Sequence, residues 1–99
     1  MNDPAALIAL AQSLTSAKVL CVGDVVLDHY RHGVVERISP EAPIPVLSVE
    51  REDAMLGGAG NVMRNLASLG SQVRCVSVVG EDAPGTEIGR LLRDIGIST

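Results

Sequence analysis

Apolar and polar residues follow two different periods along this chain, and the changes of period divide it into predicted strands and helices. Lys18 to Gly23 is an almost unbroken apolar run, which is typical of a strand buried on both faces of a parallel sheet. Gln72 to Gly80 has the same character and predicts a second core strand. A helix between two such strands makes a βαβ unit, which is parallel and right-handed. We therefore expect an α/β fold built on parallel strands, and Ile97 to Thr99 resembles the start of a further strand.

Three stretches carry apolar residues at helical spacing. The first runs from about Pro4 to Leu14, behind Asp3, which can cap it. The second lies within Leu56 to Gly70, and the third covers Thr86 to Ile95. The residues expected on the apolar stripes are Leu7, Ile8, Leu10, Ala11 and Leu14 in the first helix, Val62, Leu66, Ala67 and Leu69 in the second, and Ile88, Leu91, Leu92 and Ile95 in the third.

A glycine cluster, Gly57-Gly58-Ala59-Gly60, opens the second of these helices, and Gly70 is placed to end it. A glycine loop before a helix lets a ligand approach the backbone and presents unpaired N–H groups to oxygen-rich groups. We expect a small molecule bearing hydroxyl or phosphate groups here. The alternative is a tight turn before a crossover helix, with no ligand. At the third helix, Asp82 is the expected cap and Gly96 the expected end.

The segment from Tyr30 to Glu50 differs from the rest of the chain because it mixes apolar, charged and proline residues. Ser39 to Pro45 predicts a rigid loop between two strands that lie outside the main sheet, since proline cannot donate to a central ladder. A flap in this place would shield a site at the end of the first strand from water. Its open edge would also allow pairing with another subunit.

Asp24 and Asp28 follow the first strand, at the edge where ligands bind in open α/β sheets. Their carboxylates can accept hydrogen bonds from substrate hydroxyls. The alternative is that Asp24 caps a turn and Asp28 is solvated. His29 and His32 lie in an extended pattern without a Glu or Cys partner at ligand spacing, so we expect no metal site.

Composition narrows the class of protein. The 99 residues include 46% apolar residues and a single aromatic residue, Tyr30, so the core must be aliphatic. A net charge of −4 without a basic run argues against nucleic acid as a partner. No apolar run approaches the ~20 residues that cross a membrane, and no signal peptide is evident, so we expect a cytoplasmic protein. Cys21 and Cys75 lie far apart without a Cys-x-x-Cys motif, and we expect two small buried residues in a reducing compartment.

The glycine motif carries a resemblance to a known family. Gly57-Gly58-Ala59-Gly60-Asn61, followed by Gly70 and, after nine further residues, Gly80, resembles the N-terminal motif of the ribokinase-like (PfkB) carbohydrate kinases. Met63 departs from the pattern, because the family usually has a small residue there. Methionine can fill a groove, but it leaves the closeness of helix packing at this point open.

Within that family, three longer segments are similar to the kinases that act on D-glycero-D-manno-heptose 7-phosphate. They are Val22 to Tyr30, Arg37 to Val46 and Asn61 to Gly70. The resemblance implies ATP- and Mg²⁺-dependent phosphorylation of the anomeric hydroxyl, in the route to the heptose of lipopolysaccharide. In many Gram-negative bacteria this kinase is joined to an adenylyltransferase. Another PfkB kinase, of the ribokinase or fructokinase type, is the alternative.

The resemblance implies that residues 1–99 are the N-terminal part of one ribokinase-like domain, with no second domain. That fold has three layers, with parallel core strands, crossover helices and a small β-flap, or lid, here inserted at about residues 30–50. In this family the lid often forms the contact of a homodimer. A sugar phosphate is the implied partner, and neither nucleic acid nor a membrane is expected.

The resemblance also assigns site residues. They are Asp28, Gly57, Gly58 and Asn61, with Asp24, Arg37 and Arg64 as further candidates. The aspartate would hold sugar hydroxyls, while the two glycines and the asparagine would contact the sugar and hinge the lid. The arginines are the nearest cations for the 7-phosphate, a suggestion made from charge alone. The alternative for each arginine is an exposed salt bridge.

The family's catalytic base, an aspartate in a Gly-x-Gly-Asp motif, has no counterpart in these 99 residues. We therefore expect the sugar side of a site, without the base or the nucleotide pocket, and no ATP or Mg²⁺ bound by this chain alone. A non-catalytic pairing module built on the flap remains open. A dinucleotide-binding unit is disfavoured, because Met63 replaces its third glycine and the flap separates the loop from the first strand.

Overall fold

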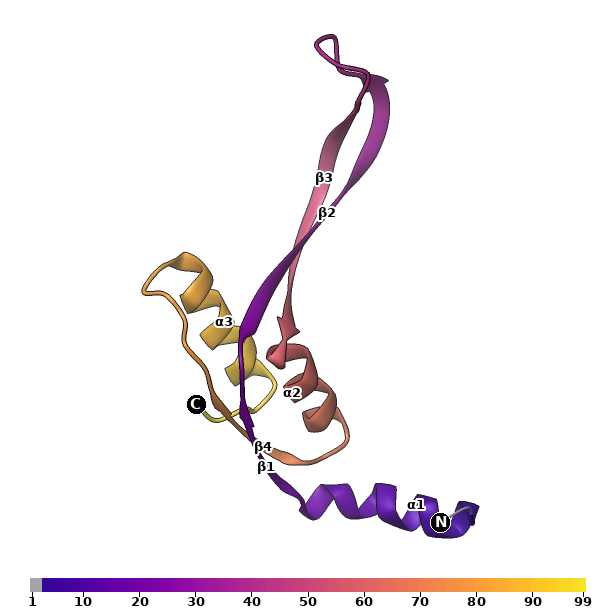
Figure 1. The fold of residues 1–99 in the computed structure, drawn as a ribbon, viewed down its shortest axis with the longest axis vertical. Coiled ribbons are helices and arrows are strands. Elements are labelled where there is room, and N and C mark those ends of the chain that lie inside the picture. The colour runs from indigo at the N-terminus through magenta and orange to yellow at the C-terminus, as the bar shows by residue number, and fades with distance from the viewer. Residues whose placement is uncertain (1–2) are drawn as a thin grey trace.

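The computed structural model describes residues 3–99, which form a small α/β core and a long β-hairpin that projects from it (Figure 1). The core elements are β1 (Lys18–Val22), α2 (Ala59–Ser68), β4 (Gln72–Val76) and α3 (Ala83–Asp94). The hairpin consists of β2 (Val25–Ile38) and β3 (Pro45–Gly58), and the chain begins with α1 (Pro4–Ser13) and the short 3₁₀ helix η1 (Leu14–Ser16).

Strands β1 and β4 pair in parallel, from Lys18 opposite Gln72 to Val22 opposite Val76, which confirms the predicted βαβ unit. The prediction that the second strand reaches Gly80 was wrong, because β4 ends at Val76. Gly23 N–H donates to the Val76 carbonyl at 3.2 Å, and β1 then turns away into the hairpin. Beyond that point β1 no longer offers a partner for the ladder. A parallel bridge between Arg74 and Ser98 confirms that the last residues begin another strand.

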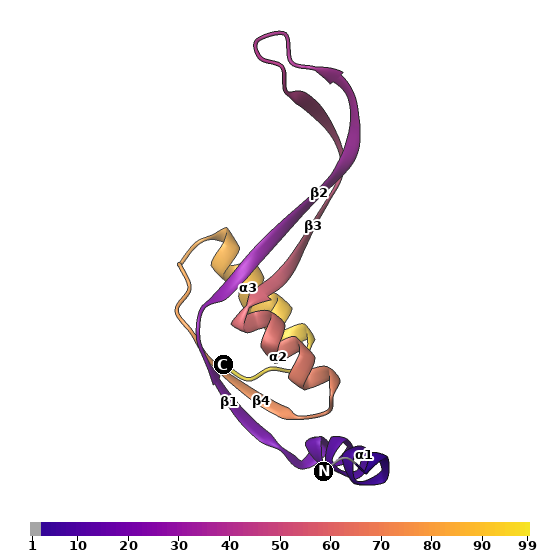
Figure 2. The ribbon, with the colours of Figure 1, turned by 45° about the vertical axis from the view of Figure 1, so that its right-hand side comes forward.

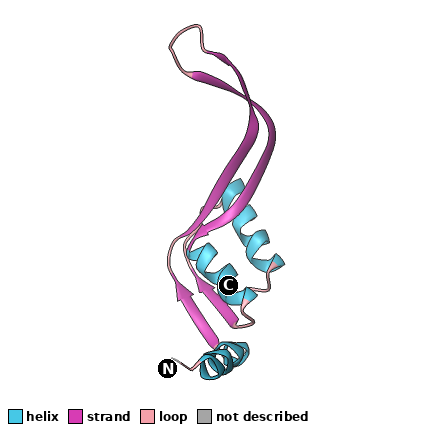
Figure 3. Ribbon diagram, turned by 90° about the vertical axis from the view of Figure 1, so that its right-hand side faces the viewer, coloured by secondary structure: helices cyan, strands magenta, loops and turns pink. Residues whose placement is uncertain are grey.

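The β1–β4 sheet is covered on one face, so the prediction of a strand buried on both faces was wrong. Val73 and Cys75 are buried, whereas Leu20 and Val22 on β1 are 59% and 69% exposed. Figure 3 shows the reason, because α2 and α3 both lie on the same side of the two strands. The described residues therefore build two layers, the sheet and one helical layer.

Helix α2 packs through a face that shares Leu66 with the predicted stripe but is centred on Met63. Met63 is fully buried, with 0% of its surface exposed, while Val62 and Leu69 are 52% and 53% exposed. A close backbone approach sets this orientation, because a Cβ added at Gly60 would lie 2.9 Å from the Leu56 Cβ. Methionine at position 63 thus fills the core beneath the helix, as its flexible side chain allows.

Helix α3 begins at Ala83, earlier than the predicted Thr86, while its apolar stripe and its capping residues follow the prediction. Ile88 and Leu92 are buried on its stripe, and the Asp82 carboxylate accepts from Gly85 N–H at 2.9 Å as the N-cap. Gly70 and Gly96, which follow α2 and α3, have φ of +93° and +79°. These are left-handed conformations that favour glycine, so both glycines end their helices as expected.

Helix α1 lies at the end of the molecule opposite the hairpin tip (Figures 1 and 2). Asp3 caps it by accepting from Ala5 N–H at 3.1 Å, as predicted. Its apolar residues Leu7, Ile8 and Leu10 are about half exposed, so the predicted stripe exists without a covering partner in the described structure. No helix within residues 3–99 is long and apolar enough to cross a membrane.

The hairpin is longer than the predicted lid and contains it. The antiparallel register runs from Val25 opposite Gly58 to Ile38 opposite Pro45, with irregularities after His32 and Val35. With the hairpin, the molecule is 60 Å long and has a radius of gyration of 19.1 Å. A compact chain of this size has a radius of gyration of about 13 Å. Most of the hairpin therefore stands clear of the core.

Candidate functional site

The base of the hairpin is tied to the carboxyl ends of both parallel strands and to the start of α2. Val25 N–H, the first of β2, donates to the Ser77 hydroxyl just beyond β4, at 3.3 Å. Ala59 N–H, the first of α2, donates to the Asp24 carbonyl at 2.9 Å. Two strand ends, a hairpin and a helix N-terminus therefore meet at the edge where α/β folds bind ligands.

Asp28 follows the first strand, and the structure places it within β2, near this junction. Its register partner is Met55, and its half-buried carboxylate lies against the backbone of Gly57 on β3. A Cβ at Gly57 would be 2.1 Å from Asp28 Oδ2. The carboxylate thus occupies the space that any other residue at position 57 would need, which brings together two of the predicted site residues.

Gly58 is the residue at which β3 becomes α2. It is the N-cap, with φ of +57°, and a Cβ there would be 2.7 Å from the Asp24 carbonyl oxygen. Both the dihedral and the crowding require glycine. The predicted glycine loop is wrong, because β3 continues through Gly58 directly into the helix.

Asn61 and Arg64 lie on the first turns of α2 and bind one another. The Arg64 guanidinium donates to Asn61 Oδ1 at 2.8 Å, with Asn61 exposed and Arg64 half-buried. Within residues 3–99 the recorded partner of Arg64 is therefore an amide, and the positive charge remains available to an anion. This arrangement holds one predicted cation close to the start of the helix.

Arg37 is not brought to the same place. It lies near the hairpin tip, opposite Val46, nine residues along β2 from Asp28. At a rise of about 3.3 Å per residue, the two residues are about 30 Å apart along the strand. Within one copy of the chain, Arg37 and the base of the hairpin form separate regions.

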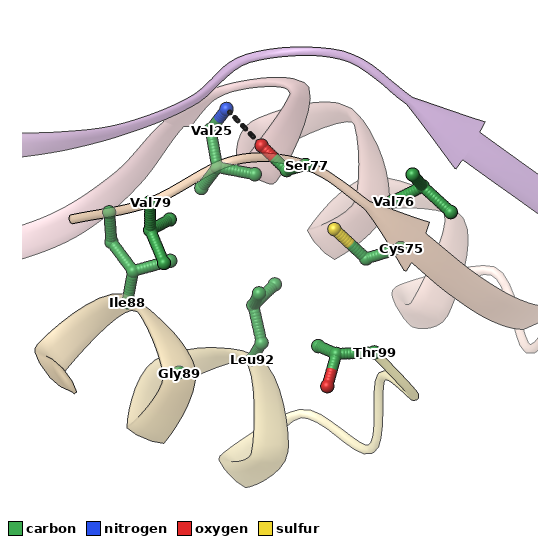
Figure 4. Close-up of a pocket in the computed structure, with 9 residues that line it drawn as sticks. All are labelled: Val25, Cys75, Val76, Ser77, Val79, Ile88, Gly89, Leu92 and Thr99. Carbon is green, nitrogen blue, oxygen red and sulfur yellow. Dashed lines mark hydrogen bonds between the residues drawn. The ribbon is translucent and has the colours of Figure 1, made fainter. Parts of the chain in front are cut away.

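A pocket of about 380 Å³ lies beside the junction, between α3 and the end of β4 (Figure 4). Val25, Cys75, Ile88 and Leu92 contribute most of its apolar wall, and the hydroxyls come from Ser77 and Thr99. None of the lining residues carries a charge. Its chemistry suits an apolar group better than a sugar phosphate.

Sequence reasoning missed two features of this region. Ser77 anchors the hairpin through a bond to a distant backbone N–H, for which the local pattern holds no signal. Cys21 and Cys75, treated as distant in sequence, are direct register partners across the two strands. A signal existed for that pairing, because Lys18–Val22 and Gln72–Val76 both have valine second and cysteine fourth.

His32 has a structural partner on the facing strand. His32 Nε2 lies 3.1 Å from Asp53 Oδ2, and the Arg51 guanidinium lies 3.2 Å from that same oxygen. Within the described range 3–99, no group of three or more His, Cys, Asp or Glu side chains is arranged to hold a metal ion.

Comparison with known proteins identifies a family. Residues 16–99 match the family described as pfkB family carbohydrate kinase. The match spans both parallel strands, the hairpin, α2 and α3.

Individual relatives are similar over nearly the whole chain. The chain is 55% identical over 96 residues to the bifunctional protein HldE of Paramagnetospirillum magneticum, covering 97% of this chain and 20% of that protein. It is 55% identical over 94 residues to HldE of Rhodospirillum rubrum, covering 95% and 19%. It is 52% identical over 89 residues to the D-beta-D-heptose 7-phosphate kinase of Bordetella bronchiseptica, covering 90% and 28%. The chain thus spans 19% to 28% of the length of these relatives.

Proposed function

The chain belongs to the pfkB family of carbohydrate kinases, and from this membership we propose that it forms the sugar-binding side and the lid of a heptose 7-phosphate kinase. The name of the Bordetella bronchiseptica relative, at 52% identity, supports this substrate. The reaction would place phosphate on the anomeric hydroxyl, in the cytoplasm, on the route to the heptose of lipopolysaccharide. Because the chain covers 19% to 28% of these relatives, we propose phosphoryl transfer only for a protein that carries the rest of the kinase.

The carboxylate of Asp28 at the base of the hairpin is the observation that carries the proposal. A carboxylate accepts short, strong hydrogen bonds from hydroxyls, and half-burial at a strand end strengthens them. Gly57 has no side chain, which leaves the Asp28 carboxylate room against the β3 backbone, and Gly58 allows β3 to turn into α2 beside it. Asn61 can donate its amide to a hydroxyl, and Arg64 is the cation that we propose for the 7-phosphate.

The test is Asp28→Ala in the full-length context, with binding of heptose 7-phosphate and of ATP measured separately by calorimetry. Loss of charge-assisted bonds worth about 1.5–3 kcal/mol should weaken sugar binding by roughly ten- to a hundredfold and leave ATP binding nearly unchanged. Asp53→Ala, which removes an exposed carboxylate from the same hairpin, is the matched control and should leave both unchanged. Loss of sugar and nucleotide binding together in Asp28→Ala would make Asp28 a structural residue.

The nucleotide and its Mg²⁺ have no proposed ligands in this chain. The described residues offer no metal-ligand cluster, and the pocket beside α3 is uncharged, which does not suit a triphosphate. Titration of the chain with MgATP should therefore give no binding heat. Micromolar affinity would overturn the assignment of this chain to the sugar side alone.

We also propose that the hairpin pairs two copies of the chain. Its exposed apolar residues, from both strands, support this interaction: Tyr30, Val34, Val35, Leu47 and Val49 are each 40% to 54% exposed. Both strands have a free edge, since the hairpin is a two-stranded sheet. The same surface supports the alternative of a non-catalytic pairing module, which the Asp28 experiment distinguishes because such a module binds no sugar.

A further inference from the structure

Cys21 and Cys75 occupy equivalent places on adjacent parallel strands. They are register partners in the β1–β4 ladder, and both belong to the face that packs against the helices. Paired strands lie about 4.8 Å apart, and this spacing falls within the range of about 4.4–6.8 Å that disulfides span between Cα atoms. Both cysteines are free in the structure.

The two thiols have different surroundings. Cys75 is 6% exposed, whereas Cys21 is only partly buried, so Cys21 is the more accessible of the two. Burial, and then the neighbouring Cys21, raise the pKa of the Cys75 thiol above its usual value. Cys75 also lines the 380 Å³ pocket, on the side of β4 that faces α3 (Figure 4). A small oxidant therefore has routes to the pair from the Cys21 side and through this pocket.

We propose that Cys21 and Cys75 form a redox-active dithiol that a peroxide converts to a disulfide across β1 and β4. The Cys21 thiolate attacks one peroxide oxygen, the O–O bond breaks, and Cys21 sulfenic acid and water form. The Cys75 sulfur then displaces the sulfenic hydroxyl, which leaves as a second water with the Cys75 proton. Two thiols are oxidised and one peroxide is reduced to two waters.

The disulfide would join β1, which leads into the hairpin, to β4, which follows α2. It would close a long loop that contains both the hairpin and α2. A link across a long loop restricts the unfolded chain, so the oxidised form should melt at a higher temperature than the reduced form. The site is separate from Asp28, and this inference does not rest on the proposed kinase function.

The test is treatment of the purified chain with hydrogen peroxide, followed by intact mass and non-reducing peptide mapping. The wild type should lose two hydrogen atoms as a monomer, give one peptide that links Cys21 to Cys75, and return to the original mass with a dithiol reductant. Cys21→Ser and Cys75→Ser should form no internal link. The two cysteines are the only ones in the sequence, so the mass is unambiguous.

Variants that shift the alignment of the two cysteines test whether the disulfide depends on their being register partners. The double variant V19C/C21V keeps two thiols on the same face but moves one by two residues, to a Cα distance of about 8 Å, beyond the reach of a disulfide. The variant V19C/C21V/V73C/C75V restores register one step away, because Val19 and Val73 are partners, and should link again. Equal linking in V19C/C21V, or conversion of wild-type cysteines only to sulfinic acid or intermolecular dimers, would overturn the proposal.

Discussion

At the scale of single residues, the glycines of this chain serve different purposes that sequence alone does not separate. A Cβ at Gly57 would meet the far end of the Asp28 side chain at 2.1 Å. A Cβ at Gly33, higher in the hairpin, would meet the Ser48 backbone oxygen at 2.0 Å. A carboxylate can rotate away from a methyl group, whereas a paired strand can move only if the ladder distorts.

Gly57→Ala should therefore affect binding more than stability. We expect the free energy of unfolding to change by no more than about 1 kcal/mol, while the displaced Asp28 weakens sugar binding in the full-length context. Gly33→Ala is the matched substitution in the same full-length context and should destabilise the protein by about 1–3 kcal/mol through backbone overpacking. Urea titration and calorimetry measure the two effects. Equal destabilisation by both substitutions would show that the Asp28 side chain cannot rotate away from a methyl group at position 57. Normal sugar binding in Gly57→Ala would show that Asp28 does not contribute to sugar binding.

At the scale of elements, α2 is held by the side chain that departs from the family pattern. Met63 is the most deeply buried side chain of the core and belongs to the same core cluster as Leu56, Val73 and Cys75. Gly60 lets the helix approach β3, and this approach selects which face turns inward. Helical periodicity predicts that one face of α2 is buried, but it does not select the face, because Val62 and Met63 are both apolar and lie next to one another.

In the full-length context, Met63→Ala should lower the free energy of unfolding by about 2–5 kcal/mol, because it leaves a cavity in a core with few other large side chains. Val62→Ala, one residue earlier and 52% exposed, should change it by less than about 0.5 kcal/mol. Chemical denaturation followed by circular dichroism measures both. Comparable losses in the two variants would mean that α2 packs through the face containing Val62.

At the scale of the whole molecule, the described chain exposes much more apolar surface than a compact domain of its size. One face of the β1–β4 sheet, the apolar residues of α1 and both edges of the hairpin are uncovered. Surfaces of this kind drive association with another protein segment. The 19.1 Å radius of gyration follows from the same arrangement, because the hairpin extends away from the core.

We expect the isolated chain to self-associate and to melt at low temperature without a sharp transition, as light scattering and calorimetry can measure. The variant V35K/L47E replaces an exposed cross-strand pair with opposite charges, which keeps the hairpin paired and removes apolar surface. It should lower the associated fraction, whereas L7E/I8K on α1 should not. A monomeric wild type with a sharp, cooperative melt would contradict this prediction. A lower associated fraction in the α1 variant alone would show that the chain associates through α1 and not through the hairpin.

The sequence by itself determined the features that depend on neighbouring residues. Asp82 and Gly96 mark the ends of α3 because a cap and a left-handed glycine act within one helical turn. The α/β class and the parallel strands followed from apolar runs separated by a helical period. Asp28 and Gly57 were identified individually as candidates for sugar binding, and that role remains a prediction.

Only the tertiary structure decided which distant residues meet. Strand pairing brings Asp28 against Gly57, extends the hairpin beyond the predicted lid, and places Cys21 opposite Cys75. It also buries Met63 in place of Val62 and leaves one face of β1 exposed. Register and helix orientation depend on contacts between segments far apart in the chain, and a local pattern is compatible with several of them. These contacts assemble the candidate site and the cysteine pair from residues that were separate in the sequence.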